Sequence, residues 1–161
     1  MPNPPEESTV KLLFHTANIY MITGLVSGLY YRELTHLTGF EGETRLSVVH
    51  THILALGMLF FLIALALEKV FALSESRLFK WFYWVYNSGV IVTVGVLTLR
   101  GTLTVLGNEP TGAADSALAG IAGLGHVVLT LGLILFFHTI EKRIKAEKAE
   151  SAAAEAEPAA A

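Results

Sequence analysis

The sequence contains no cysteine, and this absence removes several kinds of site at once. Disulfide bonds, iron–sulfur clusters and a covalently attached c-type haem all require cysteine. The common structural zinc sites use cysteine as well. Charged residues are also scarce, at 16% of the chain, and the formal net charge of −3 argues against a nucleic-acid partner.

What the chain does have is long apolar runs, and hydrophobic residues make up 53% of it. A helix needs about 20 apolar residues to cross the hydrocarbon core of a bilayer. The runs that reach this length predict an all-α membrane protein with four transmembrane helices, in contact with membrane lipid. They cover residues 10–31, 46–67, 81–99 and 117–139.

The positions of lysine and arginine predict how these helices are oriented. Eight of the 11 Lys and Arg residues flank the N-terminal run, the second connection or the C-terminal run, whereas the first and third connections hold only Arg32, Arg45 and Arg100. Because cytoplasmic loops are enriched in Lys and Arg, we expect both termini to be cytoplasmic, in a multi-pass protein of the bacterial inner membrane. The first run follows an acidic, proline-rich segment and is too long for a signal peptide, so we expect it to be retained.

The predicted organisation is therefore one membrane domain with two cytoplasmic flanks. Residues 1–9 form an N-terminal cytoplasmic segment, and residues 10–140 form the four-helix domain. Residues 141–161 have a helix-forming composition that ends in alanine, glutamate and proline. We expect them to form a helical extension that frays into a disordered tail.

Two histidines in the second run, His50 and His52, are the most informative residues of the chain. Ionisable side chains inside a membrane helix are costly and usually face a bundle interior, a cavity or a cofactor. Residues i and i+2 of a helix point about 200° apart, so we expect these two imidazoles to face opposite sides. A third histidine, His126, lies about 13 Å into the fourth run, in the same leaflet as His50 and His52 at about 6 and 9 Å.

Gly57 and Arg100 are candidate partners of a cofactor held by these histidines. Gly57 follows His50 by seven residues and so lies beneath it, where it leaves room either for a flat cofactor or for a neighbouring helix. Arg100 follows the third run and either reaches lipid phosphate or binds a carboxylate of the cofactor. Gly24 and Gly28 form a G-x-x-x-G pattern that predicts a close helix contact.

The remaining histidines carry no assigned role. His15 and His138 lie near the predicted membrane boundaries, where an interfacial position is the simplest interpretation. His36 falls in the polar first connection, where we expect it to be exposed to water.

Imidazole binds iron, copper and zinc, and the sequence favours iron held in haem b. A haem needs one or two axial histidines, an apolar slot, a small residue for clearance and cations for its propionates. A zinc hydrolase is disfavoured because no carboxylate lies at the depth of the histidines, and an electron-transfer copper site lacks its sulfur ligands. Copper remains the alternative metal.

The stretch VVHTHILALGMLFFLI, residues 48–63, resembles the H-x-H helix of subunit I of the haem–copper oxidases. In that family the two histidines ligate two different haems, and twelve helices form three four-helix units. Cations after the third helix of the H-x-H unit contact the propionates. The resemblance implies one such four-helix unit, with His50 and His52 as axial ligands and Arg100 at a propionate. The chain lacks the histidine pair of the copper centre, so we do not expect full oxygen reductase chemistry.

The chain also resembles a small family of bacterial four-helix membrane proteins of unknown function. The similarity extends over roughly residues 10 to 140 and includes VVHTH, a YRE after the first helix, LSES between the second and third, and GIAGLGH in the fourth. This resemblance implies a fold and no activity.

We therefore predict a membrane b-type haem protein that transfers electrons or carries out chemistry on a small redox or gas ligand. No catalytic residue is assigned. The alternatives are a copper- or zinc-binding or proton-relaying transport protein, and a structural membrane subunit. Because His50 and His52 face apart, a ring of subunits would let His50 of one chain and His52 of the next hold one haem, and the oxidase resemblance suggests a homotrimer. The other arrangement uses His126 as a ligand within one chain.

Overall fold

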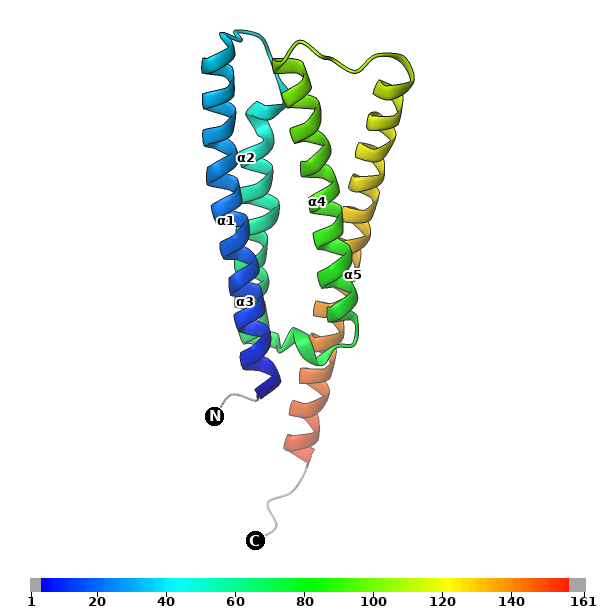
Figure 1. The fold of residues 1–161 in the computed structure, drawn as a ribbon. Coiled ribbons are helices and arrows are strands. Elements are labelled where there is room, and N and C mark those ends of the chain that lie inside the picture. Colours follow the sequence, from blue (N-terminus) through cyan, green and yellow to red (C-terminus); the bar gives the residue numbers. More distant parts are fainter. Residues whose placement is uncertain (1–3, 157–161) are drawn as a thin grey trace.

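The computed structural model describes residues 4–156, and every regular element in this range is a helix (Figure 1). Four of its helical segments are long and apolar enough to cross a membrane, which confirms the predicted class. The second of them is composite and joins four pieces end to end. The elements are α1 (Pro4–Thr38), η1 (Arg45–Val48), α2 (Val49–His52), the π-helix η2 (Ile53–Leu59), α3 (Phe60–Phe71), η3 (Leu73–Glu75), α4 (Leu78–Val105) and α5 (Gly112–Ala156).

Each spanning segment is longer than the apolar run that predicted it, because hydropathy marks the membrane crossing and not the end of the helix. α1 continues to Thr38, so that His36 lies on its last turn and the first connection shrinks to residues 39–44. α5 continues to Ala156, through the predicted helical extension, where alanine, glutamate and lysine favour a helix. The final residues of the predicted disordered tail, 157–161, lie outside the described residues.

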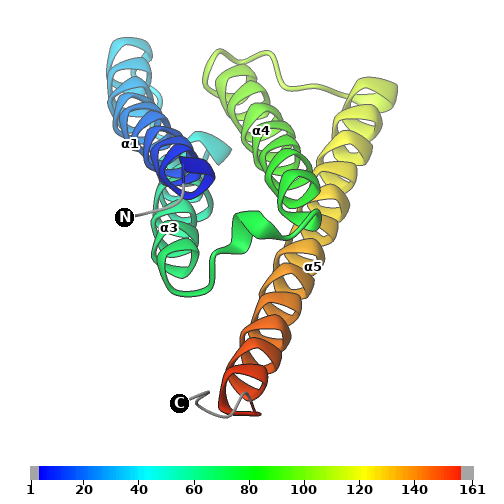
Figure 2. The same cartoon turned by 90° about the horizontal axis from the view of Figure 1, so that it is seen from below.

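The helices form two antiparallel pairs, one of α1 with the composite span and one of α4 with α5 (Figures 1 and 2). We call the end with connections 39–44 and 106–111 the upper end; α1 begins and α5 ends at the lower end. α4 contacts every other spanning segment, whereas α5 packs on α4 and reaches α3 and η3 only toward the lower end. Within residues 4–156, no Cα atom of α5 lies within 8 Å of α1, α2 or η2.

Glycines allow the close contacts within each pair. A Cβ on Gly24 would lie 2.6 Å from Leu54, and one on Gly28 would lie 3.6 Å from the Cβ of His50. The G-x-x-x-G pattern is therefore a packing face for the composite span, as predicted. Between α4 and α5 the approach is closer still, because a Cβ on Gly89 would lie 2.5 Å from the backbone nitrogen of Leu129.

An aromatic cluster fills the lower half of the bundle and joins the two pairs. Phe60 stacks on Tyr86 with 4.0 Å between ring centroids and contacts Phe136 of α5 at 5.0 Å. Phe61 and Phe82 complete the cluster and are fully buried. The composite span, α4 and α5 are thus packed together at this level.

Arg143 fastens α5 to the turn after α3 at the lower end. Its Nε donates to the carbonyl of Phe71 at 2.9 Å, and its guanidinium pairs with Glu75 at 2.6 Å. The first contact satisfies a carbonyl that the end of α3 leaves without a helical partner.

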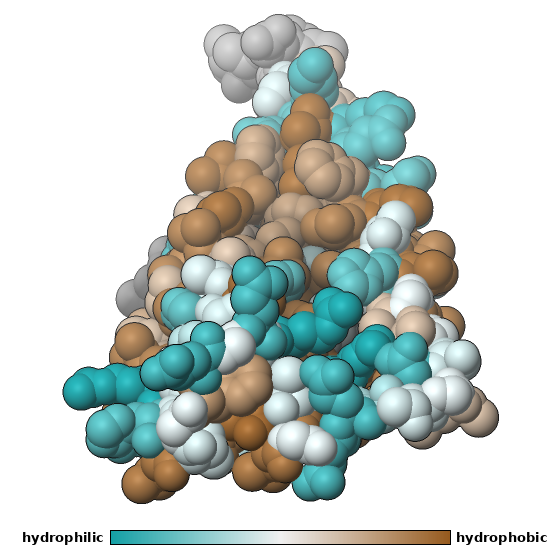
Figure 3. All heavy atoms as spheres, turned by 90° about the horizontal axis from the view of Figure 1, so that it is seen from above, coloured by the Kyte–Doolittle hydropathy of each residue, from teal (hydrophilic) through white to brown (hydrophobic). Residues whose placement is uncertain are grey.

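Large apolar side chains cover the outside of the spanning segments, as expected of helices that face lipid. Figure 3 views the upper end, where hydrophilic residues gather on the near surface and hydrophobic residues form the flank that recedes from it. The structure therefore supports a multi-pass membrane protein.

Candidate cofactor site

Contacts at the upper end fix the relative depth of the three intramembrane histidines. A Cβ on Gly101 would lie 2.4 Å from the backbone nitrogen of Leu46, and the Thr44 hydroxyl donates to the Gly101 carbonyl at 2.9 Å. Counting inward from Leu46 at 1.5 Å per residue, His50 and His52 lie about 6 and 9 Å deep. Gly125 abuts Thr93, eight residues below Gly101 on α4, which puts the neighbouring His126 about one turn deeper than His52.

His50 and His52 flank an exposed stripe of the composite span and point to different sides. Thr51, between them, belongs to that stripe, while both histidines are half-buried. His50 lies on the α1 side, against Gly28. His52 lies on the other flank, above Leu56, whose carbonyl accepts a hydrogen bond from Tyr86 of α4 at 2.9 Å. The side chain of His52 is therefore on the α4 side of the span.

One face of α4 looks toward the space between the composite span and α5. Tyr86, Thr93 and Arg100 recur at seven-residue intervals and so share this face. Tyr86 touches both neighbours, since its hydroxyl bonds the Leu56 carbonyl and its backbone abuts Gly132 of α5. Residues on the same face nearer the upper end therefore lie between His52 on one helix and α5 on the other.

His126 lies on the flank of α5 that turns toward this face. Asp115, eleven residues earlier, lies within about 20° of it around the helix and forms an ion pair with Arg100. Leu133, seven residues later, packs on the buried core that contains Phe61. The half-buried His52 and the exposed His126 thus lie on either side of one face of α4, which carries Arg100 and the buried Thr93; we call this group of four residues the histidine groove. The aromatic cluster lies below these residues, toward the lower end.

Hydrogen bonds fix which ring nitrogen of these histidines is free. Nδ1 of His52 lies 2.8 Å from the Val48 carbonyl, and Nδ1 of His126 lies 2.8 Å from the Ala122 carbonyl. A carbonyl can only accept, so each Nδ1 is the donor of this contact and Nε2 is the ring nitrogen that remains for a ligand. This is the tautomer that metal-ligating histidines adopt when the second nitrogen is held by a backbone carbonyl.

Two buried polar atoms near the histidines have no hydrogen-bond partner within the described residues. They are Nδ1 of His50 and Oγ1 of Thr93. Buried polar groups in proteins are nearly always paired, so such atoms call for an explanation by a ligand or water. Thr93 is 1% exposed, and its side chain packs beside Gly125 in the contact between α4 and α5.

Arg100 lies at the upper end of the groove, with its guanidinium paired with Asp115. Its side chain is 20% exposed and that of Asp115 45%. The pair fastens the start of α5 to the end of α4. The side chain therefore has a protein partner, which was not among the two partners expected from the sequence, lipid phosphate and a cofactor carboxylate. Asp115 was not predictable as the partner because it lies on the next helix, beyond a connection.

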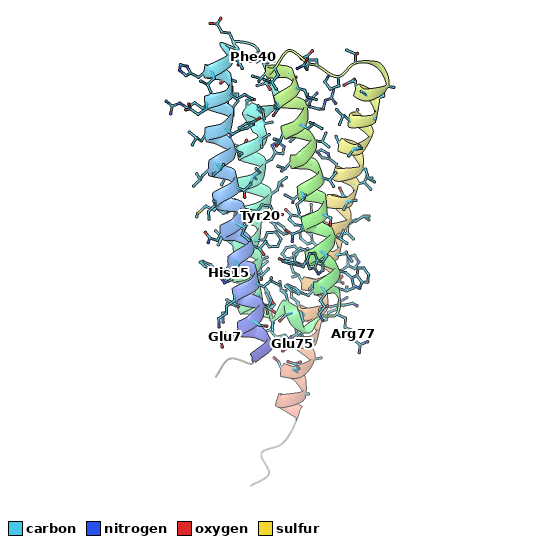
Figure 4. All side chains as sticks on the ribbon, viewed as in Figure 1. Glu7, His15, Tyr20, Phe40, Glu75 and Arg77 are labelled. Atoms are coloured by element: carbon cyan, nitrogen blue, oxygen red, sulfur yellow. The ribbon has the colours of Figure 1, made fainter. Side chains whose placement is uncertain are left out.

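Gly57 does not leave an open slot. A Cβ there would lie 2.3 Å from Cγ of Tyr20, so the ring of Tyr20 from α1 already fills the space that glycine leaves. Figure 4 places Tyr20 at mid-height of the bundle, between Phe40 at the upper end and His15 toward the lower end. In this structure Gly57 therefore provides room for a neighbouring helix, the second of the two roles expected for it, and the space expected for a cofactor is occupied by Tyr20.

The other histidines lie away from the groove. His15 and His36 are exposed on α1, and His138 is exposed in the lower half of α5 with Nδ1 at 2.9 Å from the Ile134 carbonyl. Within residues 4–156, no three His, Asp or Glu side chains are grouped so as to hold a bare metal ion. The copper and zinc alternatives therefore gain no supporting observation from the structure.

Comparison with known proteins identifies a family and nothing more specific. Neither a curated protein nor a solved structure matches the chain, so the resemblance to the haem–copper oxidases gains no support from a shared fold. A family model described as "Protein of unknown function (DUF2871)" matches residues 10–143, which include the whole histidine groove. The chain belongs to this family of proteins of unknown function.

Proposed function

We propose that the protein is an integral membrane b-type haem protein that transfers electrons or reacts with a small redox or gas ligand. One observation supports the proposal: His52 and His126 lie on either side of the same face of α4, each with Nδ1 at 2.8 Å from a backbone carbonyl, so that Nε2 is the nitrogen left for a ligand. Two imidazoles presented in this way suit the axial positions of a haem iron. When bound, haem b would supply a one-electron redox centre.

The chain's own residues would hold and tune that centre. His52 and His126 would be the axial ligands, and the aromatic cluster below them would exclude water from the lower side. Arg100, at the upper end of the groove, would neutralise a propionate in place of, or together with, its contact to Asp115. The unpaired Thr93 hydroxyl would find an acceptor or a water within the filled groove.

The homotrimer is retained as the second arrangement of the same function. In it, His50 of one chain and His52 of the next would bind one haem at each subunit interface. The contact of His50 with Gly28 leaves its ring on the α1 flank, away from the histidine groove. This geometry favours His52 and His126 within one chain for the first haem, and leaves His50 for a contact with a neighbouring chain.

The proposed orientation places the lower end in the bacterial cytoplasm. The lower end carries the connection 72–77 and the long charged extension of α5, and cytoplasmic segments are rich in lysine and arginine. The histidine groove would then lie in the outer leaflet of the inner membrane. A redox partner would approach it from the outer side.

Absorption spectroscopy of detergent-purified protein from haem-supplied cells tests the proposal. A bis-histidine haem gives a low-spin ferric spectrum and sharp α and β bands on reduction. His52→Ala and His126→Ala should each abolish binding or produce a high-spin spectrum. His138→Ala is the matched control, because His138 makes the same Nδ1 contact on the same helix outside the groove. A colourless wild-type protein would refute the haem proposal.

The ligand pair and the oligomeric state are separated by native mass spectrometry with the same variants. A haem-loaded monomer that depends on His52 and His126 supports ligation within one chain. A trimer with one haem per chain, dependent on His50 and indifferent to His126→Ala, supports ligation across the interface.

A further inference from the structure

The π-helix η2 lies directly after the two histidines and interrupts an otherwise α-helical span. A π-helical turn holds about one residue more than an α-helical turn, so everything above it is rotated by about 100° relative to an unbroken helix. Such segments are less stable than α-helix and are frequent at functional sites. The seven residues ILALGML contain no proline, and local sequence alone favours an α-helix here.

Contacts from other helices account for the widened turn. The backbone nitrogen of Phe60 donates to the carbonyls of Ala55 and Gly57 and so passes over Leu56, its partner in an α-helix. The Leu56 carbonyl instead accepts the Tyr86 hydroxyl at 2.9 Å. This bond forms in an apolar interior, where an unpaired carbonyl costs several kcal/mol.

Packing on both sides holds Tyr86 in place to make this bond. Its ring is 1% exposed and stacks on Phe60, and its backbone abuts Gly132 of α5. On the opposite side of η2, the ring of Tyr20 fills the space that Gly57 leaves. The hydroxyl of Tyr86 therefore points at one fixed carbonyl of the span, four residues below His52.

We infer that Tyr86 is a positioning residue for His52: its hydroxyl fixes the extra residue of the π-helix at Leu56, and this sets the rotation that turns His52 into the histidine groove. Without the widened turn, the helix above Phe60 would be rotated by about 100°, the angle of one residue. A residue next to His52 in the sequence would then face the position that His52 holds now. The effect of Tyr86 on a haem spectrum rests on the proposed function, whereas its effect on the π-helix does not.

The first test compares Tyr86→Phe with Tyr20→Phe. Each variant removes one hydroxyl and keeps the ring, but the Tyr20 hydroxyl donates to the Asn87 side chain at 2.7 Å and not to η2. In the haem-loaded protein, Tyr86→Phe should convert a large share of the low-spin spectrum to high-spin, because His52 no longer holds its position. Tyr20→Phe should keep the wild-type spectrum.

The second test uses hydrogen exchange of the haem-free protein in detergent. The amides of residues 53–60 should exchange about tenfold faster in Tyr86→Phe than in wild type, as expected for the loss of one buried hydrogen bond. Tyr20→Phe should leave this segment at the wild-type rate. Unchanged exchange in Tyr86→Phe overturns the positioning role, whether or not the protein binds haem. A colourless wild type with faster exchange in Tyr86→Phe refutes the proposed function and leaves the positioning of His52 intact.

Discussion

Gly89 is the position at which a single methyl group should cost the most packing energy between α4 and α5. A Cβ at Gly89 would lie 2.5 Å from the nitrogen and 2.6 Å from the Cα of Leu129, and both are backbone atoms that cannot turn aside. Ordinary van der Waals contact begins near 3.4 Å, so Gly89→Ala must move one helix away from the other. Overpacking of this kind costs about 1–3 kcal/mol.

Gly120→Ala is the matched control on the other helix of the pair. A Cβ at Gly120 meets nothing within 4 Å, so the substitution adds only the helix-forming advantage of alanine, about 1 kcal/mol. Because alanine gains the same advantage at both positions, this gain cancels, and we expect the free energies of unfolding of the two variants to differ by the overpacking cost alone, about 2 kcal/mol.

Titration with a denaturing detergent in mixed micelles measures this difference. Trp81 and Trp84, both on α4, report the transition through their fluorescence without any added label. We expect Gly89→Ala to unfold at a lower detergent fraction than wild type and Gly120→Ala at an equal or higher one. Equal midpoints for the two variants would contradict the close approach of α4 and α5.

Two further predictions concern the ion pairs that fasten α5 to the rest of the bundle, one near its start and one toward the lower end of the bundle. Arg143→Ala removes a hydrogen bond to a carbonyl and an ion pair, both made by a side chain that is 15% exposed. It should lower the free energy of unfolding by about 1–3 kcal/mol in the same detergent titration. Lys145→Ala is the control: its ion pair is exposed, and the free energy of unfolding should change by less than about 1 kcal/mol. If Arg100 and Asp115 lie near a haem, Arg100→Leu should lower the reduction potential of the haem and Asp115→Asn should raise it, because a nearby positive charge favours the reduced iron. A redox titration of both variants and the wild type measures the effect. Equal potentials in all three would mean that the ion pair has only a structural role.

The sequence was sufficient for the features that depend on one helix at a time. Apolar runs predicted the four spanning segments, and helical periodicity predicted that His50 and His52 point apart. The spacing of Gly24 and Gly28 predicted a packing face, since small residues at that interval let another backbone approach.

Features that depend on two helices were not predictable in this way. The π-helix requires Tyr86, thirty residues beyond the carbonyl that it binds, and nothing within residues 53–59 announces it. The space beside Gly57 is filled by Tyr20, a residue of another helix. The placement of His52 and His126 on either side of one face of α4 follows from how α4 packs on its two neighbours, and the sequence could supply only their similar depth.

The separation of α5 from α2 has a consequence for how the molecule is held together. In the upper half, α5 contacts α4 alone, and the Arg100–Asp115 pair links its start to α4. The upper half of α5 therefore adds few contacts that would make the two helical pairs unfold together. A ligand that bridges His52 and His126 would act as a crosslink between the two helical pairs. Binding of this ligand would then raise the free energy of unfolding, by about 4 kcal/mol when the free ligand concentration is about a thousand times its dissociation constant. Assembly of the upper half and loading of the cofactor would be a single thermodynamic event.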